Sequence, residues 1–337
     1  MGDYRRKADE FWGFAARMRL PVSQPADLDA ALCDYSDWKY LDGEQGEFGD
    51  KLEAAIKALH PEYQREGKMN LPRFFRTLKG WRKKAPSLSR MLILEQMAFA
   101  IAGALIVRGL GSMALWVVTG LSCYLRPSEN FLLRTVDVVE PAGGAPTAMK
   151  QWVIILAPIE RGYSTKTGRF DETVALDDVR VPALGELLGR QRDRRIAEFK
   201  AETKATDDDI EDGIPLWPFG TKDLLEAWRR VAKELGLELV AESSYQLRHA
   251  GASRDHLMRL RTEPEVIRRG RWADPRSART YDRPGRVQQL LHRTPQALLD
   301  YGEDIRQNFK KYSLAGSCPM PPMTKVQIKP YKAVATH

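Results

Sequence analysis

A dense apolar, alanine-rich stretch between Met91 and Leu121 constrains the fold of this chain most. Arg108 interrupts the stretch, and the apolar piece from Met97 to Val107 has 11 residues, whereas a membrane-spanning helix needs about 20. Its large apolar side chains recur at helical spacing, at Leu92, Leu94, Met97, Ile101 and Leu105. The stretch therefore predicts a buried helix pair at the centre of a domain, and no membrane partner is expected.

The chain has 337 residues, which exceeds an average domain of about 100 to 200 residues. The proline- and serine-containing segment K-K-A-P-S-L-S-R, residues 83–90, is typical of a domain boundary. We therefore predict a helical domain over 1–86 and a larger domain over 87–300. Residues 301–337 are predicted to form a C-terminal tail that is flexible after Asn308.

Helical patterns separated by proline and glycine cover the first domain, from Pro25 onward, and return after Val181. Between the two helical regions, three short runs rich in β-branched residues are separated by turn residues. These runs are V-D-V-V (136–139), Q-W-V-I-I-L (151–156) and T-V-A-L (173–176). The predicted fold class is mainly α with a small antiparallel β-sheet.

The composition favours a polyanionic partner. Lysine and arginine outnumber aspartate and glutamate by 53 to 45, a net charge of +8, and the hydrophobic fraction of 43% argues against a disordered chain. Nucleic acid is the first candidate and an anionic membrane surface the second. Cys33, Cys123 and Cys318 are widely spaced, so the sequence supports neither a disulfide framework nor a zinc site, and a reducing compartment fits best.

Positive charge is concentrated in two stretches. Residues 70–90 hold seven cations and no acid, and residues 254–286 hold ten arginines against five acids. Such stretches either are solvated helix faces or contact successive phosphates of a nucleic acid, and the second interpretation is favoured. The candidate DNA-binding residues are Arg73, Arg76, Lys79, Arg82, Lys83, Lys84, Arg268, Arg269 and Arg271.

Four segments occur in an order that resembles the tyrosine recombinases and phage-type integrases. The first, L-R-P-S-E, presents Arg126 and Glu129 after an apolar helix, and the second, S-T-K-T-G-R-F, presents Lys166 ahead of a strand. The third, S-S-Y-Q-L-R-H, is similar to the H-x-x-R box of the family and supplies Arg248. In the fourth, R-G-R-W-A-D-P-R-S-A-R-T-Y, Trp272 precedes Tyr281 by the nine residues that the family motif has.

The resemblance implies DNA strand cleavage and rejoining, with Tyr281 as the nucleophile that forms a 3′-phosphotyrosyl intermediate. Arg126 and Arg248 would stabilise the charge that develops on the phosphate oxygens. Lys166 would protonate the departing 5′ oxygen, and Trp272 would pack against the segment that bears the tyrosine. Glu129 would support Arg126. The resemblance implies neither a metal nor another cofactor.

One position departs from the family pattern. The first residue of the H-x-x-R box is Tyr245 instead of histidine, so the acceptor of the nucleophile's proton is unassigned. His249, which follows Arg248, is typical of a packed structural histidine. A DNA-binding protein that keeps the fold and does not cleave is therefore one alternative, and a topoisomerase of type IB is another, because it uses the same chemistry without synapsis.

The resemblance also bears on organisation and partners. The N-terminal domain would be a core-binding domain that clamps double-stranded DNA, and the chain would self-associate on DNA as a dimer or a tetrameric synapse. An amphipathic pattern from Val287 to Gly302 would dock on a neighbouring protomer or pack within its own chain. The expected location is intracellular, with the DNA: the nucleus in a eukaryote and the cytoplasm or nucleoid in a bacterium. An enzyme of a mobile element would fit.

Overall fold

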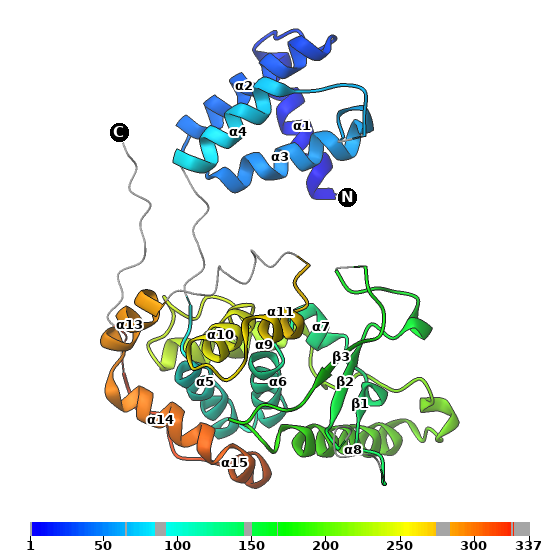
Figure 1. Cartoon of the computed structure of the whole chain (residues 1–337), viewed down its shortest axis with the longest axis vertical. Coiled ribbons are helices and arrows are strands. Elements are labelled where there is room, and N and C mark those ends of the chain that lie inside the picture. Colours follow the sequence, from blue (N-terminus) through cyan, green and yellow to red (C-terminus); the bar gives the residue numbers. More distant parts are fainter. Residues whose placement is uncertain are drawn as a thin grey trace. The chain divides into compact units, whose positions relative to one another are not determined.

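The structure is a computed structural model that describes residues 2–64, 66–84, 92–144, 150–166, 168–273, 284–324 and 326. The chain divides into two compact units, Met1–Ser89 and Arg90–Pro330, and this division lies three residues beyond the predicted boundary. The chain is mainly helical with one small antiparallel sheet, and the predicted fold class is confirmed (Figure 1).

The N-terminal unit is a helical domain with a core of its own. Phe11, Leu32, Leu52 and Phe74 are fully buried and belong to one apolar cluster, to which each of the four helices contributes. The helical patterns predicted from Pro25 onward correspond to the last three helices, and the first helix, in which Ala8, Phe11 and Ala15 mark the buried face, was not predicted. The helices are α1 (Gly2–Arg17), α2 (Pro25–Leu41), α3 (Gly46–Leu59) and α4 (Pro72–Lys84), with a 3-10 turn η1 (Pro61–Tyr63) between the last two.

The apolar stretch forms the predicted buried helix pair. The pair consists of α5 (Glu95–Val107) and α6 (Gly111–Ser122), and Arg108 caps the C-terminus of α5. Nearly all side chains of both helices are buried, because several later helices of this unit pack against them. Within the described residues, no helix combines the length and the apolar character that crossing a bilayer would require.

A three-stranded sheet follows the pair, in the order β1-β2-β3 with both neighbours antiparallel. The strands are β1 (Val138–Val139), β2 (Val153–Leu156) and β3 (Glu172–Ala175). The first two lie within the predicted runs, and β3 begins and ends one residue earlier than the predicted run 173–176. Ile154 is paired with Val138 on one side and with Val174 on the other, and all three side chains are buried. Helix α8 (Leu184–Thr203) packs against β1 (Figure 1).

The remaining elements of this unit include several that carry candidate site residues. They are α7 (Pro127–Phe131), η2 (Thr135–Asp137), η4 (Ile159–Arg161), η5 (Asp208–Ile210), α9 (Thr221–Glu234), α10 (Gln246–Leu257), α11 (Glu263–Gly270), α13 (Pro284–Arg293), α14 (Gln296–Gln307) and α15 (Phe309–Ala315).

The C-terminal tail predicted from residue 301 is corrected by the structure. Residue 301 lies inside α14, which packs along α5 within the same chain (Figure 1). A Cβ atom on Gly302 would lie 2.0 Å from the carbonyl oxygen of Gln96, which shows how closely the two helices approach. Past Asn308 the chain continues as α15, whose Phe309 is buried against Phe99, with ring centroids 5.9 Å apart. The amphipathic pattern predicted from Val287 to Gly302 thus continues into a helix that packs within its own chain, and the predicted tail overlooked the buried side chains of Ile305 and Phe309.

Candidate active site

Arg126 is presented by a sharp turn between two helices. Its backbone is extended (φ −67°, ψ 146°), and Pro127 begins α7 directly after it. Glu129 lies in the first turn of α7, where one of its oxygens, Oε2, accepts the backbone N–H of Arg126 at 2.7 Å and Oε1 accepts the Arg126 guanidinium. The predicted support of Arg126 by Glu129 is therefore a double contact, and it fixes both the turn and the side chain.

Arg248, from α10, reaches the same carboxylate from the interior. Its side chain is fully buried, and Nη1 lies 3.8 Å from Glu129 Oε2. Nη1 donates to the carbonyl oxygen of Tyr124 at 2.6 Å, and Nη2 donates to the carbonyl oxygen of Gly270. Burial and the positive charges of Arg271 and Arg126 lower the pKa of Arg248 to about 10. The site thus concentrates cationic groups where little water screens them.

Trp272 completes the wall next to Arg248. The guanidinium carbon of Arg248 lies 4.9 Å from the ring centroid of Trp272, within cation–π range. On the neighbouring side the indole stacks with Tyr124, with ring centroids 6.4 Å apart. These contacts hold the segment that leads from α11 toward residues 274–283. Tyr281, the predicted nucleophile, lies outside the described residues.

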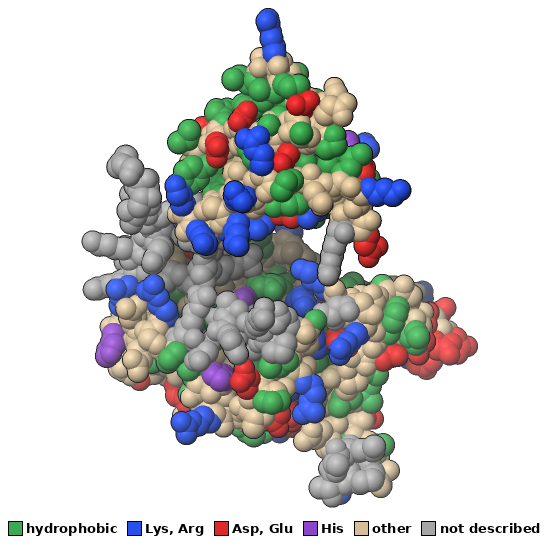
Figure 2. Space-filling view, turned by 45° about the horizontal axis from the view of Figure 1, so that its top comes forward, with side chains coloured by type: hydrophobic (Ala, Val, Ile, Leu, Met, Phe, Trp, Pro, Cys, Tyr) green, Lys and Arg blue, Asp and Glu red, His purple; other side chains and the backbone are tan. Residues whose placement is uncertain are grey.

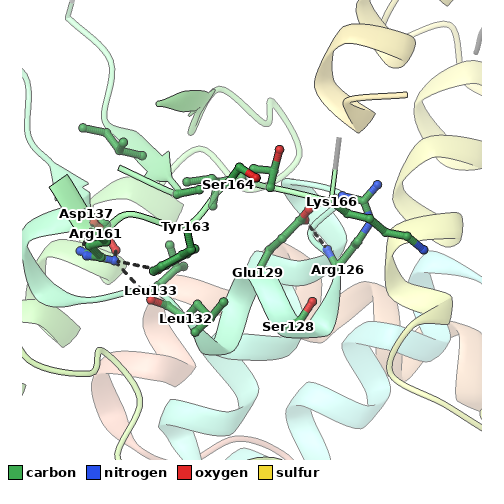
Figure 3. A pocket seen from close by; sticks show the side chains of 14 residues that line it. Arg126, Ser128, Glu129, Leu132, Leu133, Asp137, Arg161, Tyr163, Ser164 and Lys166 are labelled. Carbon is green, nitrogen blue, oxygen red and sulfur yellow. Dashed lines mark hydrogen bonds and ion pairs between the residues drawn. The ribbon is translucent and has the colours of Figure 1, made fainter. Parts of the chain in front are cut away.

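Lys166 lies on the connection between β2 and β3 and is exposed. Together with Arg126 and Glu129 it lines one end of a pocket, as Figure 3 shows. At the other end, Arg161 forms an ion pair with Asp137 through a 2.5 Å contact, beside Tyr163, and Leu132 and Leu133 lie between the two ends. The structure therefore brings the predicted lysine to the same cavity as the predicted first arginine.

Two of the predicted DNA-binding arginines are buried, and their assignment is corrected. Arg269 donates to the carbonyl oxygen of Ser122 at 2.9 Å and to Asp177 at 2.8 Å. Arg271 donates to Glu129 Oε2 at 2.7 Å. Guanidinium groups that are buried and paired in this way are not available to an external DNA backbone. Arg268, from the same segment, is exposed.

A second buried ion cluster lies close to the site, and sequence reasoning missed it. The Arg254 side chain, which is 4% exposed, contacts Glu95 and Asp178 at 2.9 Å and Asp255 at 2.7 Å. Asp255 also accepts the hydroxyl of Tyr124. Burial and the charge of Asp255 raise the pKa of that phenol. Glu95 and Asp178 come from parts of the chain distant from Arg254, so no local motif marks the cluster.

The residue that departs from the family pattern packs against its neighbour one helical turn away. Tyr245 immediately precedes α10, and its ring centroid lies 5.1 Å from that of His249. Both residues are partly buried. The packed role expected for His249 agrees with this contact. Among the described residues, no three histidine, cysteine, aspartate or glutamate side chains are grouped as metal ligands would be.

The basic strip of the N-terminal unit lies on α4, whose opposite face is buried through Phe74, Leu78 and Trp81. Its six predicted DNA-binding residues, Arg73, Arg76, Lys79, Arg82, Lys83 and Lys84, are all exposed. Arg82 differs from the others in its ion pairs with Asp50 at 2.6 Å and Glu53 at 2.9 Å. Lysine and arginine side chains gather along one side of this unit (Figure 2).

Comparison with known proteins gives a distant likeness. No protein-family model matches the chain, and no curated protein matches it. Among solved structures, it is similar to a complex described as the XerH site-specific recombinase bound to difH substrate, before cleavage. The TM-score is 0.40 and the sequence identity 13%, over 79% of this chain and 77% of that one.

Proposed function

We propose that this chain cleaves and rejoins DNA through a covalent bond between a tyrosine and a 3′-phosphate, as in site-specific recombination or integration. One observation carries the proposal. Arg126 and Arg248 come from segments far apart in the sequence and approach the two oxygens of one carboxylate, that of Glu129, at the edge of a pocket that Lys166 also lines. A single carboxylate offsets only part of this positive charge, so the site suits an anion such as a phosphodiester.

The roles follow from the chemistry of phosphoryl transfer. In the transition state, negative charge accumulates on the non-bridging oxygens of the phosphate. The Arg126 side chain is 14% exposed and reaches the pocket, so it would contact these oxygens directly. Arg248 is buried behind it and would contribute mainly through its charge, in surroundings where charge acts strongly.

The bond changes balance with residues of this chain. The hydroxyl oxygen of Tyr281 would attack phosphorus and form the new P–O bond, while the bond from phosphorus to the 5′ oxygen breaks. That oxygen would take a proton from Nζ of Lys166, which is exposed at the pocket. The hydroxyl proton of Tyr281 would pass to an acceptor that is not assigned to a residue of this chain. Rejoining would be the reverse sequence, with a free 5′ hydroxyl as the attacking group.

A trapping experiment tests the proposal. The full chain is incubated with nicked duplexes of varied sequence in the presence of a chelator, and protein-linked DNA is sought on a denaturing gel. Wild type and a Tyr4→Phe control, altered at an exposed tyrosine of α1, should form the linked species, whereas Tyr281→Phe should not. A linked band that persists in Tyr281→Phe would reject Tyr281 as the nucleophile.

The role of Lys166 has its own test. A substrate with sulfur in place of the bridging 5′ oxygen has a leaving group that needs no proton. Lys166→Ala should slow cleavage of the ordinary substrate by about 100-fold or more. The same variant should cleave the sulfur substrate at nearly the wild-type rate. Equal losses on both substrates would show that Lys166 does not act as the acid.

A second candidate function is DNA binding without cleavage, and Tyr245 favours it, because a tyrosine replaces the histidine at that position. Under this alternative, wild type would bind duplex DNA with a marked salt dependence and would give no linked band across the range of sites. Self-association on DNA as a dimer or tetramer belongs to the recombination proposal and is measurable by analytical ultracentrifugation of the protein–DNA complex.

A further inference from the structure

Arg271 occupies a backbone conformation that is unfavourable for its residue type. It follows α11 directly, with φ 53° and ψ 43°, in the left-handed region. A non-glycine residue pays roughly 1 kcal/mol or more for this conformation. Lys204 caps α8 in a closely similar way, with φ 58° and ψ 25°. A comparison of these two cationic residues therefore shows which side-chain contacts offset the free-energy cost of the left-handed backbone at Arg271.

The side chains of the pair differ completely. Lys204 is exposed, whereas the Arg271 side chain is 5% exposed. Nη1 of Arg271 donates to the carbonyl oxygen of Arg269 at 2.8 Å, and Nη2 donates to that of Tyr124 at 3.3 Å. Nη2 also contacts Glu129 Oε2 at 2.7 Å. The strained position is thus retained together with hydrogen bonds from both Nη1 and Nη2 to buried groups around the site.

The contact with Glu129 determines how that carboxylate is shared. Oε2 receives both the backbone N–H of Arg126 and Nη2 of Arg271, each at 2.7 Å, which leaves Oε1 to the guanidinium of Arg126. Without Arg271, the carboxylate would lose the group that holds Oε2 from the side of α11. Rotation of the carboxylate would then release the Arg126 guanidinium from its present direction.

The same side chain approaches the strand that follows the Lys166 loop. Nε of Arg271 lies 3.7 Å from Oε2 of Glu172, the first residue of β3. Within the described part of the chain, neither atom has a hydrogen-bond partner. Arg271 therefore lies between the turn that presents Arg126, the strand after the lysine loop and the backbone that leads into Trp272.

We propose that Arg271 is a positioning residue, which acts on the phosphate through Glu129 and Arg126 and does not contact DNA itself. The inference deepens the proposed function and rests on it for the identity of the anion that Arg126 binds. It replaces the sequence-based assignment of Arg271 to the DNA-contacting surface. Arg271, the third arginine of the site, would thus hold Glu129 in place from the interior of the protein. This role requires a left-handed backbone conformation at the end of α11.

The test is a double-mutant cycle on the full chain. Wild type, Arg271→Gly, Glu129→Gln and the double variant are compared by the rate of covalent trapping at saturating DNA and by duplex affinity. Arg271→Gly should trap DNA about 100-fold more slowly, as expected when a catalytic group moves by about 1 Å, with less than a threefold change in affinity. Lys204→Gly, which relieves the same strain far from the site, should trap DNA at the wild-type rate.

Epistasis separates positioning from direct contact. If Arg271 acts through Glu129, the double variant should trap DNA no more slowly than Glu129→Gln alone, within about threefold. If Arg271 contacts a phosphate itself, the losses should multiply and duplex affinity should fall with Arg271→Gly. That multiplicative outcome would overturn the inference.

The inference can also be judged if wild type traps no DNA, a result that would reject cleavage as the function. The same four proteins are then unfolded in urea. If the effect of the double variant on the unfolding equilibrium constant differs at least fivefold from the product of the two single effects, the result would support the positioning role of Arg271. Additive effects within twofold would show that Arg271 does not position Glu129, whatever the function of the chain.

Discussion

The guanidinium of Arg248 is completely buried, and its central carbon lies 4.9 Å from the ring centroid of Trp272. Around this pair, the charges of Arg271 and Arg126 add to the effect of burial and lower the pKa of Arg248 to about 10. A lowered pKa of a base means that the folded protein disfavours its charged form relative to the unfolded chain. The cationic site is therefore electrostatically unfavourable in the protein alone, and a bound anion would offset this cost.

Replacement of Arg248 by methionine should consequently change stability little. Removal of one partner of a buried ion pair usually costs about 3–5 kcal/mol, but here the loss of an unfavourable charge opposes the loss of two hydrogen bonds. We expect Arg248→Met to change the free energy of unfolding by less than about 2 kcal/mol, measured in urea at pH 7. Inorganic phosphate should raise the melting temperature of wild type more than that of the variant. A loss above about 3 kcal/mol would contradict this account.

Glu129 gives the site a predictable acid dependence. Burial raises the pKa of its carboxyl group, but Arg271, the backbone N–H of Arg126 and the Arg126 guanidinium together lower it below the usual value. A carboxyl group with a lowered pKa in the folded state contributes stability that is complete above its unfolded value, about 4.3. That stability is lost as the pH falls through the folded value.

The stability difference between wild type and Glu129→Gln should therefore be large at pH 6 and shrink as the pH falls below about 4. Urea unfolding across this pH range measures the difference. Glu202→Gln, which removes an exposed carboxylate from α8, serves as the control and should follow wild type throughout. A pH-independent difference for Glu129→Gln would show that its ion pairs do not contribute in this way.

The close approach of α14 to α5 predicts the effect of one methyl group. A Cβ atom on Gly302 would lie 2.0 Å from the carbonyl oxygen of Gln96, a backbone atom that cannot move without shifting α5. Gly302→Ala should destabilise the protein by about 1–3 kcal/mol, and thermal unfolding measures this. Gly285→Ala is the control, because a Cβ there has no heavy atom within 4 Å. A variant as stable as wild type would mean that α14 packs less closely than the structure shows.

The basic strip on α4 predicts a salt dependence of DNA binding. Each phosphate contact contributes about 0.9 to the slope of log K against log salt. Replacement of Arg76, Lys79 and Lys83 by glutamine should lower the magnitude of that slope by about 2 to 3. Arg82→Gln should lower the slope by less than one such contact contributes, because Arg82 already forms ion pairs with Asp50 and Glu53. Binding titrations at several salt concentrations test both, and equal slopes for wild type and the triple variant would reject a DNA-contacting role for the strip.

Local patterns in the sequence determined which segments form helices and strands in this protein. The buried pair α5 and α6, the three strand runs and the turn that presents Arg126 were all predictable, because apolar periodicity and proline or glycine act over a few neighbouring residues. The motif order also nominated Arg126, Lys166 and Arg248, and the structure brings the first two to one pocket and the first and third to Glu129.

Only the tertiary structure decided which charges face solvent and which are buried. Arg268, Arg269 and Arg271 are close in sequence and chemically identical, yet the first is exposed and the other two are buried against carboxylates and carbonyl groups from α6, α7 and the sheet. The cluster of Arg254, Glu95, Asp178 and Asp255 was equally invisible in the sequence. A guanidinium has the same local preferences in either setting, and its role depends on which distant groups the fold brings within hydrogen-bond distance.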